Sequence, residues 1–222
     1  MKPVAITVIF FGDSITEGQY VDPALRWTNL LADQFTRAYL DTPVSINFLN
    51  KGISGETSRQ GLERFARDVQ QNQPDIMTLE FGLNDCNCWI SDRGYPRNPL
   101  PVYRANMVEM IERARLFGAR EVIMQTNHET LKRKIMLSGE SLETARKRYN
   151  ETQREIAAEH GVTLCDIERG FGPMTDAQLE ESLLAYPDHL HLSMAGHVRY
   201  AQTIKPYLER ALERVNQEKT RD

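Results

Sequence analysis

A serine placed directly behind an apolar run is the first residue of this sequence that could act as a nucleophile. Residues 4–11 read VAITVIFF, and the next three residues, GDS, end in Ser14. A serine hydroxyl is a poor nucleophile unless a base removes its proton, and that base needs a partner to orient it. Asp188 and His191, three residues apart near the C-terminus, could supply the partner and the base. We therefore predict a catalytic triad of Ser14, Asp188 and His191, provided that the C-terminal loop returns to the strand before Ser14.

Acyl transfer also needs hydrogen-bond donors fixed where negative charge develops on the substrate oxygen. Three candidates follow apolar runs of the sequence: the backbone N–H groups of Ser14 and Gly55, and the side-chain amide of Asn84. Glycine lets the backbone approach a ligand closely. Asparagine, unlike aspartate, offers N–H donors. These three residues are the predicted oxyanion hole.

The elements that must position these residues are five apolar runs that alternate with amphipathic helical patterns. The predicted strands are 4–11, 44–49, 75–81, 120–126 and 162–166. The predicted helices are 24–39, 56–71, 102–117, 141–160 and 193–215. The apolar residues of the strands run continuously, which indicates strands covered on both faces of a parallel sheet. Strict alternation of strand and helix predicts one α/β domain over residues 1–222.

Three polar motifs follow the first three predicted strands: GDS, SGET and GLND. Right-handed crossovers place every loop that follows a parallel strand at the same edge of the sheet. Ligands of open α/β sheets bind at that edge, near the point where the strand order reverses. Each motif alone is a weak signal, because these residue types are common in turns. Their common edge predicts a single site.

Composition and charge exclude several classes of protein. The chain has 222 residues, a net charge of −4 and a pI near 5.8, so it lacks the basic surface that nucleic-acid binding requires. The apolar run 4–11 is far shorter than the roughly 20 residues that span a bilayer, and it is not preceded by a charged segment typical of a signal peptide. Three cysteines argue against a disulfide framework. We expect a cytoplasmic protein without a transmembrane segment. The sequence makes no prediction about the oligomeric state.

Four motifs in the order GDS, SGET, GLND and DHLH resemble the four blocks of the GDSL, or SGNH, hydrolase family. They extend from Ser14 to His191, which is most of the chain. The resemblance implies a flavodoxin-like, three-layer α/β/α fold with a five-stranded parallel sheet. It also implies hydrolysis of esters or thioesters without a metal or other cofactor. Ile15 replaces the leucine that gives the family its name.

The resemblance further implies a role for each predicted site residue. Ser14 would be the nucleophile and the first oxyanion donor, with Gly55 and Asn84 as the other donors. His191 would be the base and Asp188 its orienting partner. A small-molecule ester would be the substrate.

We expect small acyl groups, such as acetyl on a carbohydrate, because the segment over the site is polar and broken by prolines. Cleavage of lysophospholipids or acyl thioesters is an alternative within the same chemistry. Two further alternatives are a non-catalytic binding module and a metal-dependent hydrolase. The latter would use His189, His191 and His197 with Asp188, which are ordinary zinc ligands.

Other polar and aromatic residues near the motifs have a functional and a structural interpretation. Trp89 and Tyr95, in the long loop 86–101, and His128, after the fourth predicted strand, are predicted to line the substrate pocket. Their structural alternatives are covering a helix for the two aromatic rings and facing solvent for the histidine. Asp13 and Asp85 are predicted to hold their loops through hydrogen bonds.

Overall fold

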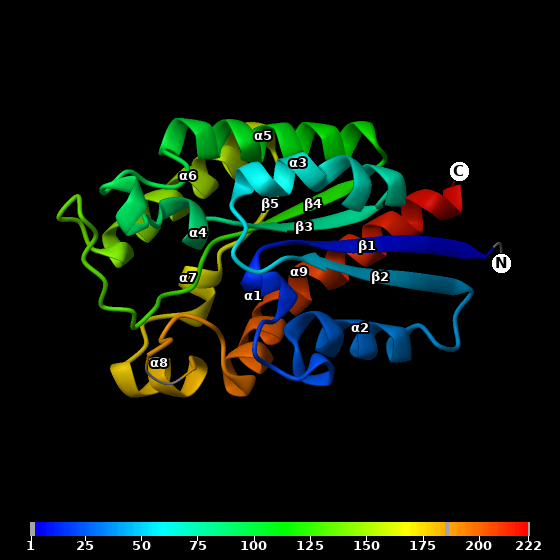
Figure 1. Ribbon diagram of the computed structural model, residues 1–222. Coiled ribbons are helices and arrows are strands. Elements are labelled where there is room, and N and C mark those ends of the chain that lie inside the picture. The colour runs from blue at the N-terminus through cyan, green and yellow to red at the C-terminus, as the bar shows by residue number, and fades with distance from the viewer. Residues whose placement is uncertain (1–2, 185–186, 222) are drawn as a thin grey trace.

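The computed structural model describes residues 3–184 and 187–221, and the described residues contain one five-stranded sheet (Figure 1). The strands are β1 (Val4–Gly12), β2 (Val44–Gly52), β3 (Ile76–Glu80), β4 (Glu121–Gln125) and β5 (Thr163–Cys165). All neighbouring pairs are parallel, in the order β2-β1-β3-β4-β5. The predicted α/β fold with a five-stranded parallel sheet is confirmed.

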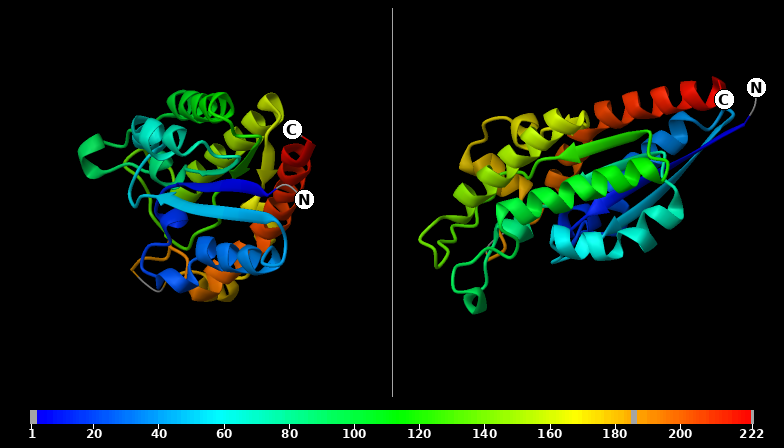
Figure 2. Two further views of the ribbon diagram at one scale, coloured as in Figure 1. Left: turned by 90° about the vertical axis from the view of Figure 1, so that its right-hand side faces the viewer. Right: turned by 90° about the horizontal axis from the view of Figure 1, so that it is seen from above.

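Helices cover both faces of the sheet and make the outer layers (Figures 1 and 2). One layer contains α3 (Ser58–Asp68), α5 (Leu100–Leu116) and α6 (Leu142–His160). The other contains α2 (Trp27–Ala38), α7 (Ile167–Phe171), α8 (Asp176–Ser182) and α9 (Met194–Arg221). Two short helices, α1 (Ser14–Glu17) and α4 (Leu83–Cys86), directly follow β1 and the turn after β3. The 3-10 helices are η1 (Pro23–Leu25), η2 (Gln70–Asn72) and η3 (Ile90–Asp92).

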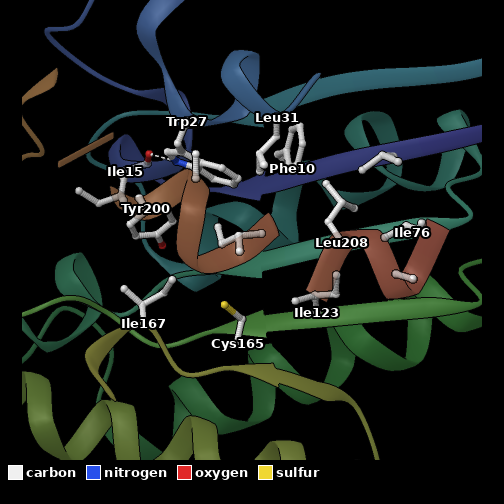
Figure 3. Packing of buried hydrophobic residues seen from close by; sticks show 14 of the residues in the cluster. Phe10, Ile15, Trp27, Leu31, Ile76, Ile123, Cys165, Ile167, Tyr200 and Leu208 are labelled. Atoms are coloured by element: carbon white, nitrogen blue, oxygen red, sulfur yellow. Dashed lines mark hydrogen bonds between the residues drawn. The ribbon is translucent and has the colours of Figure 1, made fainter. Parts of the chain in front are cut away.

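Strand β1 is the centre of the molecule because its consecutive side chains fill two separate cores. Phe10 packs edge-to-face on Trp27 of α2, with ring centroids 5.0 Å apart. Phe11, on the opposite face, packs in the same way on Phe65 of α3 at 5.3 Å. Burying each such ring contributes about 2–3 kcal/mol. Trp27 also donates from Nε1 to the carbonyl of Ile15 at 2.8 Å, which ties the turn after β1 to the core (Figure 3).

Strand β2 differs from the prediction that all strands are covered on both faces. None of its nine residues is fully buried, and exposed residues alternate with half-buried ones over its first half. The reason is its place at the edge of the sheet, where the helical layers cover it less completely.

The strand order reverses between β1 and β3, since β2 lies on one side of β1 and β3 on the other. The carboxyl ends of these strands point away from the start of β1 and the end of α9, which lie together at the opposite end of the sheet (Figure 1). A topological switch point of this kind is where open α/β sheets bind ligands. All three polar motifs lie at it.

Candidate active site

Ser14 is the first residue of α1, at the end of the central strand. Asp13 caps this short helix, because its Oδ1 accepts the backbone N–H of Ile15 at 2.9 Å. The Ser14 hydroxyl lies 2.9 Å from Nε2 of His191, although the two residues are 177 positions apart in the sequence. Nδ1 of the same imidazole lies 2.8 Å from Oδ2 of Asp188. The structure thus brings the three predicted triad residues into one hydrogen-bonded chain.

Asp188 is held as a carboxylate by the segment it belongs to. Its Oδ1 accepts the backbone N–H groups of Leu190 at 2.9 Å and His191 at 2.6 Å. Burial acts to raise the pKa of Asp188, but these hydrogen bonds and the one from the His191 ring outweigh it and lower that pKa. An ionised carboxylate at Nδ1 keeps that nitrogen protonated, so Nε2 is free to accept the proton of Ser14.

The loop that carries Asp188 and His191 returns to the sheet because its backbone is bonded to two neighbouring segments. The backbone N–H of Leu131 donates to the carbonyl of His189 at 3.0 Å, and that of Leu184 donates to the carbonyl of His191 at 2.8 Å. The imidazole Nε2 of His128 lies 2.8 Å from the carbonyl of Leu190. The condition that sequence could not test, the return of this loop to β1, is met.

The residues of the three predicted oxyanion donors, Ser14, Gly55 and Asn84, line one cavity of about 300 Å³ together with His191. Within the described residues, the backbone N–H groups of Ser14 and Gly55 donate to no other group of the protein. Nδ2 of Asn84 donates one hydrogen to Oδ2 of Asp13 at 3.0 Å, and its second hydrogen remains available. Gly55 has φ of +78°, which favours glycine, and the space where a Cβ would lie is open. The remaining lining residues are Gln19, Ser54, Leu83, Asn87, Lys132 and Leu190.

Comparison with known proteins agrees with this geometry. A model of the GDSL-like lipase/acylhydrolase family matches residues 10–199. This chain belongs to that family. An uncharacterized lipoprotein of Bacillus subtilis (strain 168), YqeF, is 31% identical over an alignment 212 residues long, which covers 85% of this chain and 84% of that protein.

Two further GDSL-like relatives resemble the chain over most of its length. An acetylxylan esterase of Geobacillus stearothermophilus is 26% identical over an alignment 211 residues long, which covers 88% of this chain and 90% of that protein. The crystal structure of the lipase/acylhydrolase from Enterococcus faecalis superposes with a TM-score of 0.72 at 26% identity, covering 91% of this chain and 95% of that one. The fold is therefore shared over most of the chain.

A buried pair of acidic side chains underlies this GDSL-like site. Asp13 and Glu80 are both almost fully buried, and Oε2 of Glu80 accepts a hydrogen bond from the Thr16 hydroxyl at 3.2 Å. Burial, together with the charge of Asp13, raises the pKa of Glu80 well above its ordinary value. Both effects favour the protonated form of Glu80. Its role was not predicted from sequence, although an acidic residue inside the apolar run 75–81 was a visible signal.

The structure places none of the three predicted pocket residues in this cavity. Trp89 lies over the guanidinium of Arg97, 4.4 Å from ring centroid to carbon, and Tyr95 lines a neighbouring cavity that also contains Arg97. His128 is 1% exposed rather than facing solvent or substrate. Burial lowers the pKa of His128 to about 4, so the ring is neutral. Its hydrogen bond with the carbonyl of Leu190 supports the loop that carries Asp188 and His191.

The histidines of the C-terminal motif do not come together as metal ligands. His197 lies buried against α2, where its Nδ1 accepts the backbone N–H of Trp27 at 3.2 Å. Over residues 3–184 and 187–221, no three His, Cys, Asp or Glu side chains form a group that could hold a metal ion. In the same part of the chain, no helix combines the length and apolarity needed to cross a bilayer.

Asp85, in the GLND motif, holds its loop as predicted. Its carboxylate accepts the backbone N–H of Ser58 at 3.0 Å and the amide of Asn98 at 2.7 Å. It thereby joins the start of α3 to the long loop before α5.

Proposed function

We propose that this protein hydrolyses carboxylic esters through an acyl-enzyme formed on Ser14. The observation that carries the proposal is the continuous chain from Asp188 through His191 to Ser14, with hydrogen-bond distances of 2.8 and 2.9 Å, at the wall of a cavity with three N–H donors. A nucleophile, a base and an orienting carboxylate in this order are the requirements for activating a hydroxyl.

The first half of the reaction forms the acyl-enzyme. Nε2 of His191 takes the proton of Ser14 as its oxygen attacks the ester carbonyl carbon. The carbonyl oxygen becomes an oxyanion and accepts hydrogen bonds from the backbone of Ser14 and Gly55 and from the amide of Asn84. His191 then gives its proton to the leaving alcohol, and the carbon–oxygen bond breaks. A water molecule, deprotonated by the same imidazole, releases the acid in the second half.

The oxyanion donors are expected to account for a large share of the rate. One such donor contributes about 3–4 kcal/mol to transition-state stabilisation, which is roughly a hundred- to thousand-fold in kcat. The donors of this site are fixed before substrate arrives, since two are backbone groups and the Asn84 amide is already bonded to Asp13.

For substrates, we propose esters of short acyl groups, such as acetyl, on polar alcohols such as carbohydrates. The cavity of about 300 Å³ has polar or charged side chains at Gln19, Asn87 and Lys132, and only Leu83 and Leu190 offer apolar ones. Such a lining gives a long acyl chain little apolar surface to bury. The similarity to an acetylxylan esterase along 90% of that protein supports the same substrate class.

The experiment that tests the mechanism is labelling with a serine-directed fluorophosphonate, followed by mapping of the modified peptide. We expect one label on Ser14 and none on the Ser14→Ala variant, which should also lose turnover of p-nitrophenyl acetate. Ser91→Ala, at an exposed serine of η3, is the matched control and should keep both label and activity. Turnover retained by a folded Ser14→Ala variant would contradict the proposal.

The substrate class is tested by p-nitrophenyl esters of increasing acyl length. We expect kcat/KM to be highest for the acetyl or propionyl ester and to fall as the chain grows. A maximum at eight carbons or more would instead favour the alternative of a lysophospholipase or acyl thioesterase.

A cytoplasmic location stays a prediction. Its support is that Cys86, Cys88 and Cys165 are all free thiols and all buried. Fractionation of cells that produce the protein from its complete gene, with detection by an antibody, is the test. Recovery in the membrane fraction would contradict it.

A further inference from the structure

Arg97 contacts both of the residues that carry oxyanion donors from outside the nucleophile turn. It lies in the connection between α4 and α5, on the rim of the sheet edge where the site is built. Its Nη1 donates to the carbonyl of Gly55 at 2.9 Å and lies 3.4 Å from Oδ1 of Asn84. Its Nη2 donates to Oε1 of Gln60 at 3.2 Å. Among the described residues, no other side chain forms hydrogen bonds with both Gly55 and Asn84.

The contact with Asn84 determines which way the amide faces. Nδ2 of Asn84 points at the Asp13 carboxylate and Oδ1 points at the Arg97 guanidinium. A flip of the amide would place its oxygen against the carboxylate and its N–H groups against a cation, so both contacts would become repulsive. A carboxylate accepts only, and a guanidinium donates only. The second Nδ2 hydrogen is thereby held toward the cavity.

Gly55 is fixed from two sides. On one side, the backbone N–H and the hydroxyl of Ser54 both donate to Oε2 of Glu17, at 2.7 and 2.5 Å. On the other side, Arg97 binds the carbonyl of Gly55 itself. Glycine has more backbone freedom than any other residue, so without these restraints its N–H would sample several directions.

Arg97 is itself held in place. The ring of Trp89 covers the guanidinium of Arg97. The backbone N–H of Arg97 donates to the carbonyl of Asn87 at 2.9 Å. The next residue, Asn98, is buried and bonded to Asp85 at 2.7 Å. A cation over an indole face is a favourable pair.

We propose that Arg97 is a positioning residue that orients two of the three oxyanion donors, Asn84 and Gly55, and that Trp89 keeps its guanidinium at this place. The inference rests on the proposed ester hydrolysis. It makes the loop between α4 and α5 part of the machinery that stabilises the transition state. Arg97 reaches the reaction through other residues, so its loss should lower kcat while leaving KM nearly unchanged.

The first test compares Arg97→Gln with Arg93→Gln, which removes the same charge from an exposed position of the same loop. For p-nitrophenyl acetate, we expect kcat of Arg97→Gln to fall about tenfold or more, and less than the loss of a whole donor. KM should stay within about threefold, since interactions made only in the transition state change kcat alone. Arg93→Gln should match the wild-type protein. A kcat of Arg97→Gln within about twofold of wild type would overturn the inference.

A double-mutant cycle tests whether Arg97 acts through Asn84. In an Asn84→Ala background, the additional Arg97→Gln change should cost much less in kcat than it costs in the wild-type protein. Residues that act as a unit show such non-additivity. A loss in the double variant equal to the product of the two single losses would overturn the part of the inference that concerns Asn84.

Chemical rescue separates positioning from a general loss of structure. Arg97→Ala opens a space into which free guanidinium ion can bind, and millimolar guanidinium, well below denaturing amounts, should restore part of kcat. The absence of rescue in a variant with wild-type thermal stability would count against the inference. Fluorophosphonate labelling keeps the two proposals apart: an unlabelled wild-type Ser14 refutes the ester-hydrolase mechanism, whereas equal labelling rates in wild type and Arg97→Gln refute only the role of Arg97.

Discussion

Asn84 donates a hydrogen bond from Nδ2 to the carboxylate of Asp13 at 3.0 Å, and Asp13 is the residue before Ser14. One contact therefore joins the turn that carries the nucleophile to the turn that carries an oxyanion donor. Asp13 also caps the helix that begins at Ser14. Any movement of one turn is transmitted to the other, so nucleophile and donor keep a fixed relation.

Gly55→Ala is expected to impair catalysis without a steric clash. Gly55 has φ of +78°, and no atom lies within 4 Å of an added Cβ. The variant should lose about 1–2 kcal/mol of stability from backbone strain, and its kcat should fall because relief of that strain moves the Gly55 N–H. Gly139→Ala is the matched control, with φ of +84° and equally open space. We expect similar denaturation midpoints for the two variants and loss of activity only in Gly55→Ala.

Asp188→Asn should lower kcat strongly while the fold is kept. An asparagine can still bond to the imidazole, but it no longer fixes the proton on Nδ1, so Nε2 is no longer reliably the acceptor. In a serine protease the same change costs about 10⁴-fold, and we expect a loss of similar order. Asp41→Asn, at an exposed position far along the chain, serves as the control. Steady-state kinetics decide, and a loss below about tenfold would contradict the role of Asp188.

Glu80→Gln should change how stability depends on pH. Burial and the nearby Asp13 raise the pKa of Glu80, so the native state holds a proton that the unfolded chain releases above the ordinary pKa of 4.5. Stability is therefore lost as pH rises from about 4.5 toward the raised value. The glutamine is neutral in both states and can still accept from Thr16. Urea unfolding at pH 5 and pH 8 should show a smaller decline for Glu80→Gln than for wild type, and identical declines would contradict the buried proton.

His128→Gln should change how stability depends on pH below neutrality, where wild-type stability falls as the pH falls. Burial lowers the pKa of His128 from 6.5 to about 4, so the unfolded chain binds a proton that the native state excludes. The corresponding stability is present above pH 6.5 and is lost as pH falls toward 4, by about 3 kcal/mol. Glutamine cannot titrate, yet it can donate to the carbonyl of Leu190. Between pH 7 and pH 4.5, the free energy of unfolding should therefore fall less for this variant than for wild type. An equal fall would refute the interpretation.

The strands and helices were predictable from sequence because local patterns determine them. Continuous apolar runs predicted the ends of β1 and β3 to within one residue. The helical pattern 141–160 corresponds to α6. The edge strands β2 and β5 were the exceptions in burial, since a sequence cannot say which strand has a neighbour on only one side. The short helices α1, α4, α7 and α8 were not predicted, because four to seven residues carry little periodicity.

Ser14, Gly55, Asn84, Asp188 and His191 were predicted from sequence because each lies in a short motif and the motifs keep a fixed order. The position in the chain was the reason to assign Trp89, Tyr95 and His128 to the pocket. Tertiary packing places their side chains outside the cavity at Ser14. The direction of a side chain from a long loop depends on the segments packed against it. In Trp89 that partner is Arg97, eight positions away, and in His128 it is the loop at Leu190.

Sequence by itself determined the α/β alternation, the single edge that collects the motifs and the chemical types of the site residues. Only the tertiary structure decided that the loop of His191 reaches Ser14, that Arg97 holds Asn84, and that Glu80 shares a buried site with Asp13. The physical reason is range. Apolar periodicity and turn preferences act over a few residues, whereas hydrogen-bond geometry and burial depend on atoms that lie far apart in the chain and meet only after folding.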